Sequence, residues 1–170
     1  YMVENNVLQL ALWQALEAHP QVTLLHGSAL RAMQAQDAVH RLHLQDGTNI
    51  EARLVVGADG ALSQVRQMAG IGVQGWQYPQ SCMLITVQSE NEPGDSTWQQ
   101  FTPTGPRAFL PLYDSWASLV WYDTPARIRQ LQAMSMGQLQ REISAHFPPR
   151  LGKVTPVAAG AFPLTRRHAL

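Results

Sequence analysis

The residues with the clearest capacity for chemistry lie in one short stretch, residues 54–66, with the sequence LVVGADGALSQVR. Its first three residues, 54–56, form an apolar run with two β-branched side chains, which predicts a buried strand. Gly57 and Gly60 then allow the backbone to turn sharply and to approach another group closely. Open α/β sheets bind their ligands at the carboxyl ends of their strands, so Asp59 is a candidate ligand contact.

A short helix is expected directly after this turn. Ser63 is placed to cap that helix, and Arg66 follows about one turn later. The spacing also fits a plain strand-to-helix turn in which Asp59 caps its own loop, since short Gly-Asp-Gly turns are common. Both interpretations remain open on the residues alone.

The stretch Gly57-Ala58-Asp59-Gly60, with its downstream Ser and Arg, resembles the Asp-Gly motif of the single-component flavin-dependent aromatic hydroxylases. The resemblance implies FAD as cofactor and NAD(P)H as reductant, because this motif contacts FAD in that family and is also implicated in NAD(P)H binding. The cofactor-binding residues implied in this way are Gly57, Asp59, Gly60, Arg66 and, at the start of the first helix, Asn5.

Three segments of the second half strengthen this resemblance. They are residues 99–106 (QQFTPTGP), 109–112 (FLPL) and 118–121 (SLVW), which resemble the ubiquinone-biosynthesis branch of these hydroxylases. The implied substrate is a polyprenyl benzoquinol, whose electron-rich ring is hydroxylated without a protein nucleophile, so no catalytic residue is assigned. The branch further implies a multi-protein quinone-pathway complex and peripheral contact with a membrane.

Aromatic side chains are concentrated on the expected strands of the second half. They predict either a packed core or one sheet face that walls an apolar ligand pocket. For the second interpretation, the candidate substrate-binding residues over the ring are Phe109, Pro111, Trp121 and Phe162.

The elements that must position these residues follow from periodicity and turn signals. The first half predicts a helix over 5–18, strands over 22–25, 29–36, 39–44 and 50–56, and a hairpin turn at Asp46-Gly47. The second half predicts strands over 82–89, 98–102, 108–112 and 117–122, helices over 125–133 and 135–146, and a short apolar segment over 160–164. Ser135 is the expected cap of the last helix.

These elements predict an α/β (α+β) fold in three parts. Residues 1–72 are part of a Rossmann-like FAD/NAD(P)H-binding domain with a β-meander, and they carry the Asp-Gly motif. Residues 73–164 form an antiparallel-sheet substrate-binding domain with helices, and residues 165–170 begin the return to the FAD domain. We expect the chain to be an internal piece of a longer protein, because the glycine-rich ADP-binding fingerprint of the family is missing.

The composition excludes several other classes. The formal net charge is zero and charged residues make up 14% of the 170, so no nucleic-acid partner is expected. The six histidines show no metal-ligand spacing, so no metal site is expected. The single Cys82 fits a reducing compartment, and no apolar run approaches the ~20 residues of a membrane span, so we expect a cytoplasmic protein with membrane association at most.

Two other functions remain open on the sequence. One is hydroxylation of a different small phenol, which a closed polar pocket would favour. The other is a non-catalytic lipid-binding or assembly module, which binding of isoprenoid or protein without flavin would favour.

Overall fold

The computed structural model describes residues 2–170, which fall into two compact units. One unit contains the chain as far as Leu10 together with Gln77–Arg166, and the other contains Ala11–Trp76 together with Arg167–Leu170. Each unit therefore draws on distant parts of the sequence. The domain limits expected above (1–72, 73–164 and 165–170) stay a prediction.

A three-stranded antiparallel meander forms the centre of the second of these units. Its strands are β1 (Leu30–Gln36), β2 (Val39–Leu44) and β3 (Asn49–Ala52), in the order β1-β2-β3. The hairpin at Asp46-Gly47 joins the last two strands, and the Asp46 carboxylate accepts a hydrogen bond from the Thr48 backbone N–H at 2.9 Å. The meander expected from the sequence is confirmed.

The predictions for two strands are wrong, one fully and one in part. Residues 22–25 have no regular secondary structure, and the strand expected over 50–56 ends at Ala52. Leu54 and Val56 are each 77% exposed rather than buried. A strand exists only through hydrogen bonds to a neighbouring strand, and the part of the chain that the structure describes offers no partner to residues 54–56.

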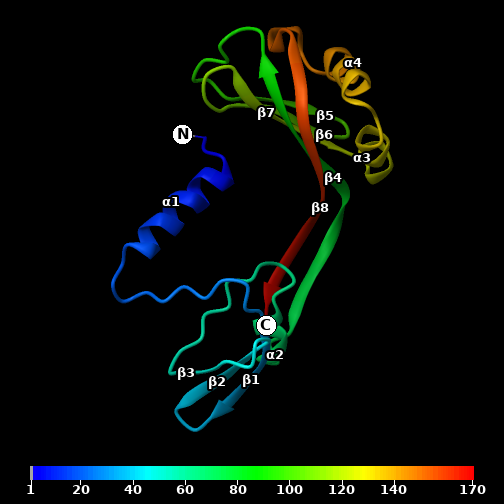
Figure 1. Ribbon diagram of the computed structural model, residues 1–170. Coiled ribbons are helices and arrows are strands. Elements are labelled where there is room, and N and C mark those ends of the chain that lie inside the picture. Colours follow the sequence, from blue (N-terminus) through cyan, green and yellow to red (C-terminus); the bar gives the residue numbers. More distant parts are fainter. Residues whose placement is uncertain (1) are drawn as a thin grey trace. The chain divides into compact units, whose positions relative to one another are not determined.

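A five-stranded sheet with the order β5-β6-β7-β4-β8 organises the other unit (Figure 1). Its strands are β4 (Val73–Ser89), β5 (Trp98–Thr102), β6 (Gly105–Pro111), β7 (Trp116–Asp123) and β8 (Val154–Ala169). Strand β5 pairs with β6, β6 with β7 and β7 with β4, and all three pairings are antiparallel. The expected strands are present, but β4 and β8 extend well beyond the segments 82–89 and 160–164.

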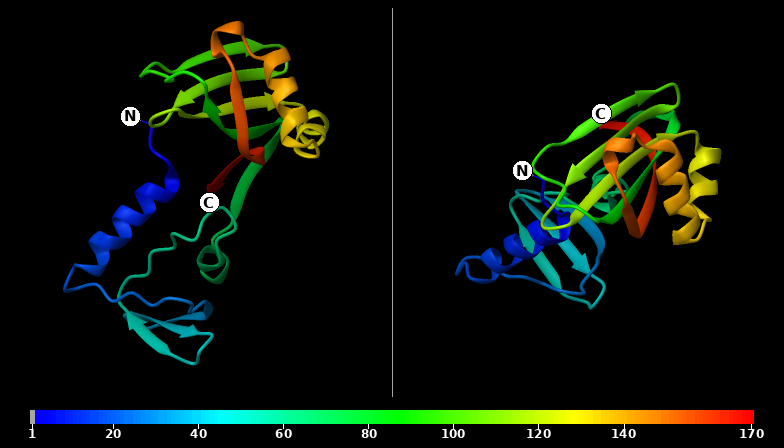
Figure 2. Two further views of the ribbon diagram at one scale, coloured as in Figure 1. Left: turned by 45° about the horizontal axis from the view of Figure 1, so that its top comes forward. Right: turned by 90° about the horizontal axis from the view of Figure 1, so that it is seen from above.

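Helices α3 (Pro125–Gln132) and α4 (Met136–His146) pack against one face of this sheet, as Figure 2 shows from two directions. A single turn of 3₁₀ helix follows at Pro149–Leu151. Alternate sheet residues point toward the helices and form the core with them. The fully buried members include Met83, Ile85, Leu119 and Trp121 from the sheet and Ile128, Leu131, Leu139 and Ile143 from the helices.

The remaining helices are α1 (Asn5–Glu17) and the short α2 (Gln64–Met68). Neither contains a buried residue. Among the described residues, no helix is both long enough and apolar enough to cross a membrane.

Candidate functional site

The Asp-Gly turn is held together by the Asp59 carboxylate. One of its oxygens accepts a hydrogen bond from the Ser63 hydroxyl, and the other accepts from the backbone N–H groups of Gln64 at 2.7 Å and Val65 at 3.1 Å. The Ser63 hydroxyl oxygen in turn accepts from the Arg66 backbone N–H at 3.0 Å. Asp59 therefore caps the start of α2 together with Ser63, and both expected capping roles are present.

These hydrogen bonds also set the charge of Asp59. They lower the pKa of its carboxyl, first through the Ser63 hydroxyl and then through the Val65 backbone N–H. The carboxylate is therefore ionised at neutral pH while it caps its own loop. A ligand at this turn meets a fixed negative charge at the start of the short helix.

The two glycines of the turn contribute in different ways. Gly60 has a φ of +83°, which favours glycine, and no atom lies within 4 Å of the position that a Cβ would take. At Gly57 a Cβ would lie 3.0 Å from Val65 Cγ1, so this residue lets the turn pack against α2. The Gly60 backbone is thus accessible to a ligand that approaches closely.

Two guanidinium groups converge on the same side of the loop. Arg66 Nη1 donates to the Ala61 carbonyl oxygen at 3.2 Å, and Arg167 Nη1 donates to the same oxygen at 3.1 Å. Among the described residues, neither guanidinium has an acidic partner. The pair supplies positive charge next to the Asp-Gly turn, as an anionic phosphate group requires.

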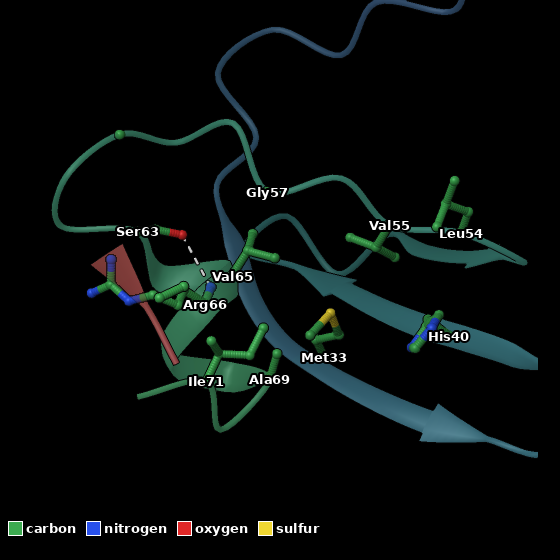
Figure 3. A pocket seen from close by; sticks show the side chains of 12 residues that line it. Met33, His40, Leu54, Val55, Gly57, Ser63, Val65, Arg66, Ala69 and Ile71 are labelled. Carbon is green, nitrogen blue, oxygen red and sulfur yellow. Dashed lines mark hydrogen bonds between the residues drawn. The ribbon is translucent and has the colours of Figure 1, made fainter. Parts of the chain in front are cut away.

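A cavity of about 410 Å³ lies between this turn, α2 and the meander (Figure 3). Its wall is mainly apolar and includes Met33, Val55 and Ile71, with His40 on the β2 side. The Nδ1 atom of His40 is buried and has no hydrogen-bond partner in residues 2–170. No local signal in the sequence indicates that His40 lines the same cavity as the turn.

Other expected site residues lie elsewhere in the chain. Asn5 is the first residue of α1 and is exposed, and it belongs to the other compact unit. Its role at a cofactor stays a prediction. Within residues 2–170, no three His, Cys, Asp or Glu side chains gather closely enough to hold a metal ion.

The four residues expected to wall a substrate do not share one environment. Trp121 is 0% exposed and Phe109 6% exposed, and both lie in the core beneath α3 and α4. Pro111 is also buried, whereas Phe162 on β8 is 54% exposed. Phe109 and Trp121 thus lie on the sheet face that the helices cover, and the substrate role of all four residues stays a prediction.

The opposite face of the same sheet is more accessible. Strand alternation places on it the residues Cys82, Leu84, Phe101, Leu110, Val120 and Tyr122, which we call the open face. Phe101 is 80% exposed and Leu84 41% exposed. The Tyr122 hydroxyl and the Cys82 thiol interact there, and burial raises the pKa of both groups.

The chain matches a known protein family. The family model described as FAD binding domain matches residues 1–161, so the chain belongs to the FAD binding domain family. The family resemblance predicted from the sequence is thereby confirmed.

Individual curated proteins are also similar to this chain. The chain is 74% identical over all 170 residues to 3-demethoxyubiquinol 3-hydroxylase of Escherichia coli, of which it covers 44%. It is 38% identical over 157 residues, 92% of the chain, to ubiquinone hydroxylase UbiL of Rhodospirillum rubrum, of which it covers 37%. The chain thus spans less than half the length of these curated relatives.

Solved structures support the fold. A ternary complex of aklavinone-11 hydroxylase with FAD and aklavinone matches 99% of this chain and 34% of its own, with a TM-score of 0.74 and 21% identity. The mixed α/β class with antiparallel sheets is therefore confirmed.

Proposed function

We propose that this chain is part of a flavin-dependent monooxygenase that hydroxylates the ring of a polyprenyl benzoquinol in ubiquinone biosynthesis. The observation that carries this proposal is the 74% identity to 3-demethoxyubiquinol 3-hydroxylase, which extends over every residue of the chain. FAD is the cofactor of the proposed reaction, NAD(P)H the reductant and dioxygen the oxidant. Bound FAD would pass electrons from NAD(P)H to dioxygen, so that one oxygen atom enters the ring and the other leaves as water.

The residues of the Asp-Gly turn fit such a cofactor. The unobstructed Gly60 backbone permits close approach, and the Arg66 guanidinium matches the charge of a pyrophosphate. Asp59 keeps the turn in shape by capping α2. Gly57 allows the turn to pack on Val65, and these residues together are the proposed cofactor contacts.

The open face of the five-stranded sheet is the proposed substrate side. Its exposed apolar members, Leu84 and Phe101, suit an aromatic ring with a hydrocarbon tail. The Tyr122 hydroxyl offers a hydrogen bond to a ring oxygen. Because a polyprenyl tail partitions into lipid, we also propose peripheral contact of the whole protein with a membrane and association with other enzymes of the same pathway.

A flavin titration of the protein at its natural length tests this proposal. We expect FAD fluorescence to be quenched on binding, and Asp59→Ala to reduce FAD retention at least several-fold because the turn loses its cap. Asp95→Ala, in an exposed loop of the other unit, is the matched control and should bind like the unmodified protein.

Turnover then separates the candidate substrates. A polyprenyl benzoquinol should gain one oxygen atom when NAD(P)H is supplied, as followed by mass spectrometry. Turnover of a small phenol alone would favour the phenol hydroxylase. Binding of isoprenoid without any FAD would contradict the enzymatic function and would favour a lipid-binding module.

A further inference from the structure

The Ala61 carbonyl is contacted by two arginines that lie far apart in the sequence. Arg66 lies in α2, five residues after Ala61, and donates at 3.2 Å. Arg167 lies 106 residues after Ala61, near the end of β8, and donates at 3.1 Å. In Figure 3 the Arg66 side chain points away from Met33 and His40.

A second contact ties the end of β8 to the same segment. The Leu170 backbone N–H donates to the Gly72 carbonyl at 3.0 Å, and the Leu170 side chain lies 3.3 Å from the position of a Gly72 Cβ. Residues 167–170 thus contact the segment 61–72 near both of its ends. All of these residues belong to one compact unit.

The Arg167 contact acts next to a glycine of the turn whose carbonyl accepts a hydrogen bond from the Ser63 backbone N–H at 3.1 Å. Gly60, next to Ala61, has a φ of +83° and no neighbour within 4 Å of a Cβ position. Glycine gives this backbone wide conformational freedom, so packing does not hold it. Asp59 fixes the helix side of the turn, whereas the Ala61 peptide is fixed by the two arginines.

We propose that Arg167 is a positioning residue for the cofactor: by holding the Ala61 carbonyl, it fixes the Asp-Gly turn in the conformation that binds FAD. This inference rests on the proposed function, in which the turn contacts FAD. Arg167 acts through Ala61 and Gly60, and the sequence motif alone does not include it. Arg66 has a contact with the same carbonyl, but it already belongs to the motif.

The test compares Arg167→Met with Arg167→Lys in the natural-length protein. We expect Arg167→Met to weaken FAD binding about three- to tenfold, in line with the loss of one typical intramolecular hydrogen bond. Arg167→Lys keeps a cation that can reach the carbonyl and should recover part of this loss. Arg31→Met, an exposed cation on β1 of the same unit, is the matched control and should bind FAD normally.

Hydrogen exchange distinguishes positioning from general destabilisation. In the absence of FAD, the amides of Ser63, Gln64 and Val65 should exchange faster in Arg167→Met, while the thermal midpoint of the protein stays within about two degrees of the unmodified one. Arg167→Lys should show an intermediate exchange rate.

The outcomes separate this inference from the function on which it rests. Unchanged FAD affinity and unchanged loop exchange in Arg167→Met would overturn the positioning role and leave FAD binding intact. Equal losses in Arg167→Met and Arg31→Met would also overturn it, because the effect would then be one of net charge. An unmodified protein that fails to bind FAD would overturn the proposed function, and the inference with it.

Discussion

At the scale of single residues, the Asp59 carboxylate shows how an acidic side chain in a binding motif can serve its own loop. Both of its oxygens are engaged by Ser63 and by the first backbone N–H groups of α2. The two interpretations that the sequence left open are therefore compatible. An Asp that caps its loop also fixes the position of Gly60, which a cofactor can approach.

The lowered pKa of Asp59 gives a prediction with a definite sign. Because the folded pKa lies below the ordinary value of 3.8, the contribution of the carboxylate to stability is fully present above that value and is lost as the pH falls through the lowered pKa. An NMR titration of the side-chain carboxyl should therefore give a midpoint below 3.8. Ser63→Ala should raise the midpoint toward the ordinary value, since the Ser63 hydroxyl is the largest cause of the shift.

Ser28→Ala provides the control for this titration. Ser28 donates to Asp46 at 2.5 Å, in the hairpin turn of the meander, and the same kind of hydrogen bond lowers the pKa of that carboxyl. Its removal should shift Asp46 and leave Asp59 unchanged. A midpoint for Asp59 at or above 3.8 in the unmodified protein would contradict the capping geometry.

At the scale of elements, local capping signals were reliable and strand signals depended on context. Ser63 and Ser135 cap α2 and α4 as expected, and Thr124 caps α3. Such caps involve atoms only three residues apart, so the sequence contains all of the interaction. Residues 54–56 have the composition of a buried strand, but composition supplies no hydrogen-bonding neighbour.

The capping box of α4 gives a prediction at this scale. The Ser135 hydroxyl accepts from the Gln138 backbone N–H at 3.4 Å, and the Gln138 side chain accepts from the Ser135 backbone N–H at 2.9 Å. Ser135→Ala should lower the free energy of unfolding by about 1 kcal/mol, measured by urea denaturation. Ser144→Ala, within the same helix, should change it by only a few tenths of a kcal/mol, roughly the difference in helix propensity. Equal effects of the two substitutions would contradict the importance of the cap.

At the scale of the whole molecule, the two faces of the five-stranded sheet differ in how far their side chains are buried. Helices α3 and α4 cover one face, where Phe109 and Trp121 lie in the core. The open face carries Leu84 and Phe101, which are largely accessible. Strand alternation predicts two faces, but it does not say which of them the helices cover.

Substitutions on the two faces should therefore differ in their effect on the free energy of unfolding. Trp121→Ala should lower the free energy of unfolding by about 3–5 kcal/mol, because it leaves a large cavity in a close-packed core. Phe101→Ala should change stability by less than about 0.5 kcal/mol, since the side chain is 80% exposed.

In the natural-length protein, the same Phe101→Ala change should raise the KM for the quinol several-fold and leave FAD affinity unchanged. A quinol KM unaffected by Phe101→Ala would remove this residue from the proposed substrate side.

The amino-acid sequence by itself determined the family, the meander, the antiparallel sheet and the helix caps, because each depends on motifs or on interactions between residues close in the chain. Only the tertiary structure decided which sheet face is buried, that Phe109 and Trp121 belong to the core, and that His40 lines the same cavity as the Asp-Gly turn. It also decided that Arg167 reaches Ala61 from 106 residues away. These features depend on contacts between distant segments, and such contacts leave no local pattern in the chain.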